Sequence, residues 1–175
     1  MKLTPIMQKY ILHWGEMGTR WGVNRTVAQI HALLYLSPEP LHAEEIAETL
    51  SVARSNVSTS LKELQSWGLI RVSHMMGDRR DHFESLKDLW EMFRVIMEER
   101  KRREIDPTLT MLRACELEGS RDHETSKEIK QRISDVREFM ETISSYYEQM
   151  RQVPSPTLIK LIKLGSKVTA LLGKK

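Results

Sequence analysis

The pattern between residues 42 and 68 constrains the fold of this 175-residue chain more than any other stretch. The segment HAEEIAETL places its apolar residues on one face of a short helix. Three residues, SVA, connect it to a second helical pattern, in which Val57, Leu61 and Leu64 form a narrow apolar stripe. Gly68 follows that pattern, and glycine readily adopts the left-handed conformation that ends a helix. The stretch therefore predicts two helices joined by a three-residue turn.

An alternating segment follows these two helices. The residues LIRVSHMM, 69–76, place Ile70, Val72 and Met76 on one side of a half-buried strand. The segment GDRRD supplies a turn, and DHFES can return as the second strand of a hairpin. Helix, turn, helix and hairpin in this order predict a winged helix-turn-helix domain. The expected fold class is mainly α with a small β-hairpin wing.

Helical patterns also precede the turn. The first has apolar residues at spacings of three and four, which predicts an N-terminal helix with one apolar stripe. This stripe consists of Ile6, Tyr10, Trp14, Met17 and Trp21. Asn24 is a good N-cap for a second helix, which must end at Pro38 and Pro40 because proline cannot continue it.

The chain after residue 85 is helical in pattern. Its first apolar stripe consists of Leu86, Leu89, Trp90, Phe93, Ile96 and Met97. We expect a break before Pro107, a long amphipathic helix over residues 126–150 and a last one over 157–173. The apolar stripe of the long helix consists of Ile129, Ile133, Val136, Met140, Ile143 and Tyr147.

These patterns divide the chain into three parts. Residues 1–22 form an N-terminal helix, 23–85 the winged helix-turn-helix domain and 86–175 a helical dimerisation region. The first and last parts carry the apolar stripes that lie outside the winged domain. We therefore expect both to contribute to a dimer interface.

The helix after the SVA turn carries a contiguous polar face of small side chains. Serine, threonine and asparagine are mediocre helix formers, because their side chains compete for backbone hydrogen bonds. Short hydroxyl and amide groups can approach base edges in the DNA major groove without clashing, whereas Arg54 and Lys62 are expected to contact phosphates. The expected DNA-binding residues are Arg54, Ser55, Asn56, Ser58, Thr59 and Lys62. A solvated helix face is the alternative, and the flanking turn and hairpin favour DNA.

Asp78, Arg79 and Arg80 lie at the expected tip of the hairpin. The negative potential of a narrow minor groove attracts arginine, and an aspartate beside it can orient the guanidinium. The alternative for this segment is a turn that is merely polar. Arg20 and Arg25 are weaker candidates for phosphate contacts.

Composition and charge limit the partners of the chain. The net charge is +3, but residues 1–84 contain nine basic and nine acidic residues, so bulk charge does not identify a nucleic-acid partner. No apolar run approaches the roughly 18 residues that span a bilayer. We expect no secretory signal, because MKLTPIMQKYILHW lacks a charged n-region, an apolar h-region and a small-residue cleavage site. Because Cys115 is the only cysteine, we expect a reducing, cytoplasmic setting and no membrane partner.

No set of residues indicates catalysis. The six histidines show no metal-ligand spacing, and the sequence has neither a glycine-rich phosphate loop nor a nucleophile elbow. We expect no enzymatic activity, no cofactor and no metal. Cys115 is expected to be a small core residue, with a redox switch as the minority alternative.

The first half of the chain resembles the GbsR-like branch of the MarR-type transcriptional regulators. The resemblance rests on the WG-x-x-R run, the LYLSPEPL segment, RSNVS-x-x-L-x-E-L-x-x-WGL and the wing GDRRD, in that order. It implies a homodimer built from N- and C-terminal helices, with two winged heads on a pseudo-palindromic operator. For some relatives it also implies repression relieved by a small ligand such as choline. Ala53 and His42 depart from the pattern, since each stands where a better helix cap is usual.

We therefore expect a homodimeric, sequence-specific DNA-binding regulator that acts as a repressor. Its recognition helix would enter the major groove and its wing the minor groove, and a small-molecule effector would modulate it. The alternative is a winged-helix module for protein contact, such as an antirepressor, that does not itself read DNA.

Overall fold

The computed structural model describes residues 1–172, with side chains as far as residue 165. Two compact units are present, Met1–Ile96, which we call the head, and Met97–Lys175, which we call the helical unit. Helix α5, Leu89–Arg100, begins in the first and ends in the second. Every helix in the described part is too short or too polar to cross a lipid bilayer.

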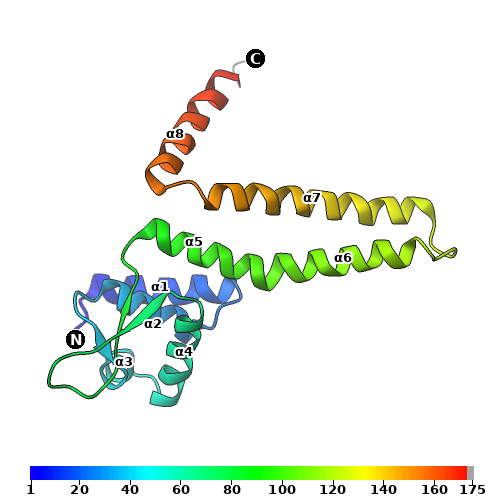
Figure 1. Cartoon of the computed structure of the whole chain (residues 1–175). Helices are drawn as coiled ribbons and strands as arrows, with labels where there is room; N and C mark the ends of the chain where they lie inside the picture. The colour runs from blue at the N-terminus through cyan, green and yellow to red at the C-terminus, as the bar shows by residue number, and fades with distance from the viewer. Residues whose placement is uncertain (173–175) are drawn as a thin grey trace. The chain divides into compact units, whose positions relative to one another are not determined.

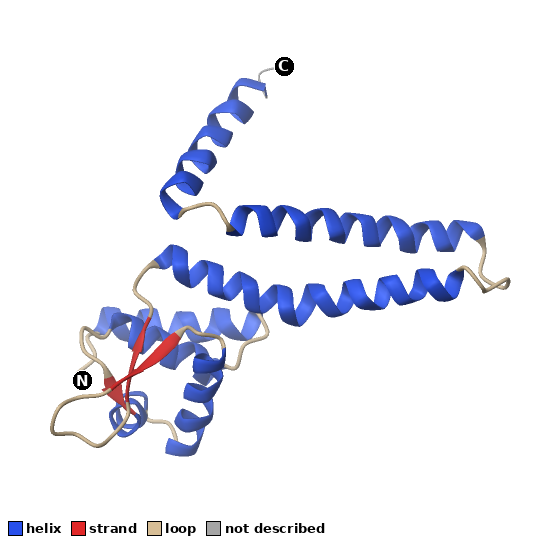
Figure 2. Ribbon diagram, in the orientation of Figure 1, coloured by secondary structure: helices blue, strands red, loops and turns tan. Residues whose placement is uncertain are grey.

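The head has the predicted winged helix-turn-helix arrangement (Figures 1 and 2). Its elements before α5 are α1 (Pro5–Arg20), α2 (Arg25–Leu36), β1 (Leu41–His42), α3 (Ala43–Leu50), α4 (Arg54–Ser66), β2 (Ile70–Ser73) and β3 (His82–Ser85). The helices form because their apolar residues recur on one face, and their ends follow local signals. Asn24 Oδ1 accepts a hydrogen bond from Thr26 N at 2.8 Å, and Gly68 has a φ of 75°, both as predicted.

The predicted hairpin is confirmed, but it is part of a three-stranded antiparallel sheet in the order β1-β3-β2. Phe83 pairs with Leu41 on one side and Val72 on the other. Strand β1 was not predicted, because its two residues carry no alternation. Strand β2 is shorter than predicted, since it ends at Ser73 and Met76 is fully exposed.

Helix α2 lies at the centre of the head core. Its buried residues are Val27, Ala28, Ile30, His31, Ala32, Leu33 and Leu34. At its C-terminal end the Lys87 ammonium donates to the carbonyl oxygens of Leu34, Tyr35 and Ser37 at 2.7–2.9 Å. These carbonyls have no amide partner further along the helix, so Lys87 acts as a side-chain cap supplied by the chain after β3.

Helix α1 packs closely on α2 through glycine. A Cβ atom on Gly18 would lie 2.5 Å from the Cβ of Ala28, so only glycine permits this approach. The buried face of α1 consists of Ile11, Gly15 and Gly18, and the predicted stripe is wrong at its two ends. Ile6 and Trp21 are 82% and 52% exposed. The buried positions each lie one residue after a predicted one, so the face of α1 that packs on α2 is rotated from the predicted stripe.

In the helical unit, a π-helical segment, Lys101–Ile105, links α5 to α6, Asp106–Gly119. The break predicted before Pro107 is therefore wrong. A proline ring clashes with the carbonyl four residues earlier, and a π-helical turn can absorb that clash without ending the helix. We attribute the π-helical segment to Pro107 for this reason.

The rest of the helical unit follows the prediction. Helix α7, Lys127–Arg151, turns back along α6, and α8 covers Ser155–Leu172 (Figure 1). Residue 173 of the predicted last helix lies outside the described residues. Ion pairs join α6 and α7, including Arg137 Nε to Glu116 Oε2 at 2.7 Å. The apolar stripe of α7 is only half-buried, and Ile129, Val136 and Ile143 are exposed.

His31 is a titratable group inside the core of the head. It is 4% exposed, and its Nε2 has no hydrogen-bond partner among the described residues. Burial lowers the pKa of His31 to about 4, because the imidazolium would lose its hydration in this site. The folded head therefore holds a neutral His31.

This burial predicts a loss of stability in mild acid. Between pH 6.5 and about 4, His31 is protonated in the unfolded chain and neutral in the folded chain. The free energy of unfolding therefore falls as the pH is lowered. The expected total is about 3 kcal/mol, the size of a shift of two to three pKa units. Urea unfolding of the wild type and of His31→Leu at pH 7, 5.5 and 4.5 measures it. Equal pH dependence in the two proteins would contradict the assignment.

Candidate nucleic-acid interface

The polar face of α4 is exposed, and its apolar stripe anchors it in the head. Val57, Leu61 and Leu64 are at most 2% exposed, as predicted, and Ser60 is buried beside them. The exposed residues are Arg54, Ser55, Asn56, Ser58, Thr59 and Lys62. Thr59 Oγ1 donates to the Ser55 carbonyl at 3.1 Å, which leaves its oxygen lone pairs free to accept. Ala53 provides no side-chain cap, as expected from its type.

A groove of about 300 Å³ lies between α4 and the chain around β3. Arg54, Ser58 and Lys62 line it from α4, and Arg80 lines it from the wing. The structure thus brings together four of the predicted DNA-binding residues. Three of them, Arg54, Lys62 and Arg80, place cationic side chains along this groove.

The other predicted residues lie outside this groove. Ser55, Asn56 and Thr59 are exposed on α4, and Arg79 is exposed in the wing. Arg20 and Arg25 are exposed at the turn between α1 and α2.

The two wing arginines differ in how they are held. Arg80 is bound by Asp78, whose Oδ1 accepts from the Arg80 backbone N–H and from Nε, both at 2.9 Å. Arg80 Nη1 also lies 2.9 Å from His42 Nε2. No hydrogen bond or ion pair within the described residues holds the Arg79 side chain. The prediction that an aspartate orients a wing guanidinium applies to Arg80.

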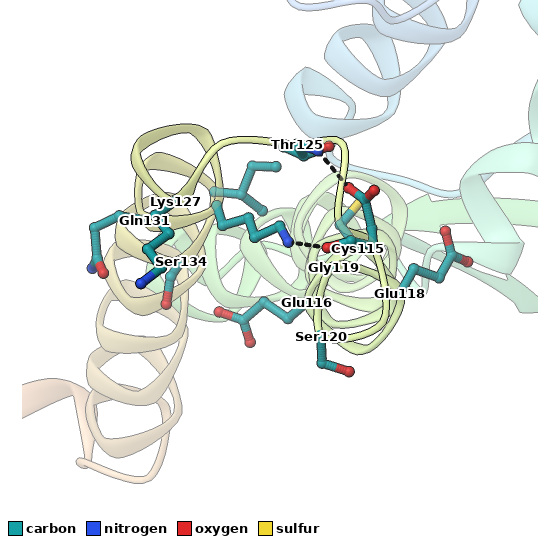
Figure 3. Close-up of a pocket in the computed structure, with 12 residues that line it drawn as sticks. Cys115, Glu116, Glu118, Gly119, Ser120, Thr125, Lys127, Gln131 and Ser134 are labelled. Atoms are coloured by element: carbon teal, nitrogen blue, oxygen red, sulfur yellow. Dashed lines mark hydrogen bonds between the residues drawn. The ribbon is translucent and has the colours of Figure 1, made fainter.

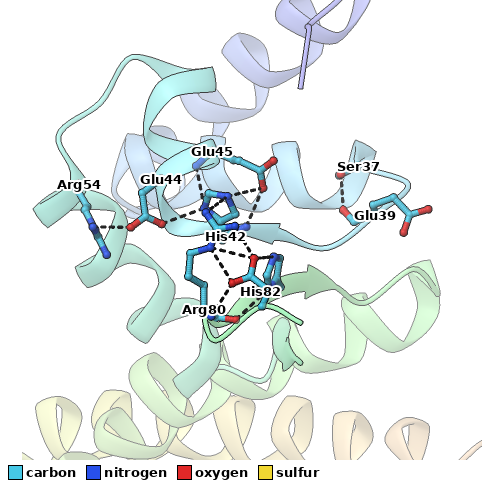
Figure 4. A network of polar contacts seen from close by, with 9 residues as sticks. Ser37, Glu39, His42, Glu44, Glu45, Arg54, Arg80 and His82 are labelled. Carbon is cyan, nitrogen blue, oxygen red and sulfur yellow. Dashed lines mark hydrogen bonds and ion pairs between the residues drawn. The ribbon is translucent and has the colours of Figure 1, made fainter. Parts of the chain in front are cut away.

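Polar contacts continue from Arg80 to the recognition helix (Figure 4). His42 Nδ1 lies 3.0 Å from Glu44 Oε2, and Glu44 Oε1 forms a 2.5 Å ion pair with Arg54 Nη1. The pKa of Glu44 is lowered, first by its own backbone N–H and then by His42 and Arg54. A chain of four polar side chains therefore joins the wing, α3 and α4.

His42 and Glu44 were not among the predicted site residues, and the prediction that His42 is a poor cap is wrong. The His42 N–H donates to Glu45 Oε2 at 3.2 Å, and the Glu45 N–H lies 3.4 Å from His42 Nδ1. These are the two halves of a capping box. The available signal was Glu45, three residues after His42, which is the spacing of a capping box.

The helical unit has a second hollow, of about 690 Å³, at the turn between α6 and α7 (Figure 3). Cys115 and Glu116 line it from α6, and Lys127, Gln131 and Ser134 line it from α7. Cys115 is half-buried beside this hollow, with its thiol 3.6 Å from Met111 Sδ, so its prediction as a core residue is wrong. Within residues 1–172 no three histidine, cysteine or acidic side chains are grouped to hold a metal.

Known proteins are similar to parts of this chain. Residues 21–81 match the MarR family. The chain is 20% identical over 136 residues to the HTH-type transcriptional repressor GbsR of Bacillus subtilis (strain 168), covering 76% of this chain and 75% of GbsR. It is also similar in fold to the crystal structure of a transcriptional regulator. The TM-score is 0.63 at 18% identity, and the match covers 84% of this chain and 96% of that one.

The Asp78–Arg80 pair gives a prediction about acid. Hydrogen bonds from the Arg80 side chain and then from its backbone N–H hold the pKa of Asp78 well below its usual range. The Arg80 amide resonance should therefore show no titration step near pH 4, where an ordinary aspartate takes up its proton. NMR spectra between pH 5 and 3 measure this. In Arg80→Ala the residue-80 amide should titrate at a higher pH than in the wild type, because the side-chain hydrogen bonds are lost and only the backbone N–H still donates to Asp78. A step near pH 4 in the wild type would contradict the pairing.

Proposed function

We propose that this chain, whose winged-helix domain belongs to the MarR family of transcriptional regulators, is a homodimeric repressor of transcription. In this proposal α4 enters the major groove of double-stranded DNA and the wing enters the adjacent minor groove. The target is a pseudo-palindromic operator, which two symmetric heads can occupy. The name of GbsR, a transcriptional repressor, supports the choice of repression over activation.

The observation that carries the proposal is the groove between α4 and the wing. Every major groove of DNA is separated from its neighbouring minor groove by one sugar-phosphate strand. A protein with a helix in one groove and a wing in the other must therefore straddle that strand. Arg54, Lys62 and Arg80 border the groove where the strand would pass, and their charges suit phosphate. Glu44 and Asp81 also line this groove, so the cations exceed the carboxylates by one.

The predicted DNA-binding residues outside the groove have other roles in this proposal. Ser55, Asn56 and Thr59 are exposed on α4 and short enough to reach base edges. The Arg79 side chain is exposed in the wing and suits a narrow minor groove. Arg20 and Arg25 remain candidates for phosphate contacts beside the main interface. The proposed binding to DNA agrees with the cytoplasmic location that the sequence predicts.

Exposed apolar residues on α7 support the homodimer. Ile129, Val136 and Ile143 recur every seven residues, and Phe139 and Tyr146 follow Val136 and Ile143 at a spacing of three. This is the spacing of a coiled-coil seam, and each of the five side chains is at least 48% exposed. A second copy of the chain would cover the seam with an identical one. Residues 1–22 also expose apolar side chains, Ile6 and Trp21, and we assign them to the same dimer.

Selection of bound sequences from random DNA tests the proposed function. A homodimer should enrich two inverted half-sites whose centres lie about 34–36 Å apart, one turn of the double helix. Failure to enrich any sequence at low salt would reject DNA reading. It would favour the alternative, a winged-helix module that contacts protein.

Phosphate contact by Lys62 can be measured separately. Lys62→Ala should weaken binding about tenfold on every sequence and reduce the slope of log affinity against log salt by about 0.9, the value for one lost phosphate contact. Fluorescence anisotropy on operator and random duplexes at several salt concentrations gives both numbers. Arg121→Ala removes an exposed charge from the α6–α7 turn and should change neither. An unchanged slope for Lys62→Ala would remove this residue from the interface.

The seam on α7 predicts which substitutions separate the dimer. Phe139 and Ile143 are 63% and 48% exposed and lie one turn apart. Replacing both with aspartate should raise the dimer dissociation constant at least about a hundredfold, because charges would oppose each other across an apolar contact. Light scattering coupled to gel filtration measures the mass. Ser145→Asp, on an exposed position of the same helix, is the control, and a doubly substituted protein that stays dimeric would count against the seam.

We assign a small-molecule effector to the hollow at the α6–α7 turn. A ligand there would touch both helices and could change the separation of the two heads. A metabolite screen by thermal shift should find a stabilising compound that also changes DNA affinity. Ser134→Trp would fill the hollow and should abolish the response while the protein stays folded. A response that survives in this variant would place the effector elsewhere.

A further inference from the structure

We infer that His42 is a positioning residue that fixes the wing arginine Arg80 relative to the recognition helix. The inference rests on the proposed function, because it concerns how two DNA-contacting elements keep one spacing. His42 and Arg80 are 38 residues apart in the sequence, and their side chains meet at 2.9 Å.

The contacts form a continuous path from α4 to the wing. Arg54 Nη1 lies 2.5 Å from Glu44 Oε1, and Glu44 Oε2 lies 3.0 Å from His42 Nδ1. His42 Nε2 then meets Arg80 Nη1, and Arg80 Nε lies 2.9 Å from Asp78 Oδ1. Figure 4 shows His42 between Glu44 and Arg80. The imidazole is the link through which the wing side of this path reaches the recognition helix.

The protonation of His42 follows from its neighbours. Arginine has only donors, so His42 Nε2 must accept from Arg80 and carries no hydrogen. The single proton of the neutral ring is then on Nδ1, where it donates to Glu44 at 3.0 Å. This tautomer keeps the half of the capping box that runs from the His42 backbone N–H to Glu45 Oε2 at 3.2 Å. It gives up the longer half, from the Glu45 N–H to Nδ1 at 3.4 Å. Nε2 also lies 3.4 Å from Glu45 Oε2, farther than the 2.9 Å to Arg80 Nη1, so the shorter contact of each ring nitrogen defines its role.

The ring of His42 is also held in place by packing. It is 11% exposed, and its centroid lies 5.5 Å from that of His82 at an interplanar angle of 89°. His82 is its register partner across β1 and β3. Because the sheet fixes the ring and the ring fixes one side of the guanidinium, Arg80 is held from two sides, by His42 and by Asp78. The Arg80 side chain is still 53% exposed, which leaves a face for DNA.

Arg79 provides the matched control for this arrangement. It is the neighbouring arginine of the same wing, it is exposed, and no contact in the described residues ties it to His42. Loss of His42 should therefore act through Arg80 and not through Arg79. A general loss of folding would instead affect DNA binding equally in every background.

The experiment is a pair of double-mutant cycles on DNA affinity in the full-length chain. His42→Leu should weaken operator binding about tenfold in the wild type and in Arg79→Ala, but no more than about twofold in Arg80→Ala. His42→Gln keeps an acceptor near the position of Nε2 and should recover most of the loss. Equal losses of affinity from His42→Leu in all three backgrounds would overturn the inference. It would also be overturned if His42→Gln bound the operator as weakly as His42→Leu.

A measurement without DNA separates this inference from the proposed function. Nitrogen-15 NMR of the histidine rings should show His42 as the neutral tautomer with its proton on Nδ1, and Arg80→Ala should alter that signal while Arg79→Ala should not. A proton on Nε2 would overturn the link even if DNA binding is intact. A protein with the expected tautomer that selects no DNA would instead reject the proposed function, and with it the role of the link in DNA binding.

Discussion

Burial of α2 is the constraint on which the rest of the head depends. Ile30 and Leu33 are completely buried, and α1, α3, α4 and β3 all pack on this helix. The apolar stripe of α4 faces this core, so its polar side must face solvent. Lys87 ties the chain after β3 to the last carbonyls of α2. Helix α2 thus fixes the position of α4, which carries the short polar groups, and of the chain at the base of the wing.

Features that depend on neighbouring residues could be predicted from the sequence. The cap at Asn24, the left-handed Gly68 and the buried face of α4 each follow from spacing within one or two helical turns. The same local reasoning selected the polar residues of α4 and the pairing of a wing arginine with an aspartate. It misplaced the ends of the α1 stripe, because the contact of Gly18 with Ala28 depends on how two helices approach each other.

Features that depend on distant residues could not be predicted. Strand β1 is visible only through its pairing with β3, since Leu41 and His42 alone have no strand pattern. The link from His42 to Arg80 depends on that register, so its residue types gave no sign of it. The helical run through Pro107 depends on a π-helical turn, which has no sequence signal comparable to a cap. The candidate site was therefore predicted as a set of contacts with DNA, without the contacts that hold it together.

The acidic partners of the interface arginines have a consequence for selectivity. Arg54 is paired with Glu44 and Arg80 with Asp78, so a phosphate must share each guanidinium with a carboxylate or displace it. On random DNA that competition is offset only by charge, whereas a matching site also satisfies the short polar groups of α4. The carboxylates of Glu44 and Asp78 thus compete with the DNA phosphates for the two guanidinium groups. A head with as many acidic as basic residues can in this way disfavour indiscriminate binding and leave the choice of site to the bases.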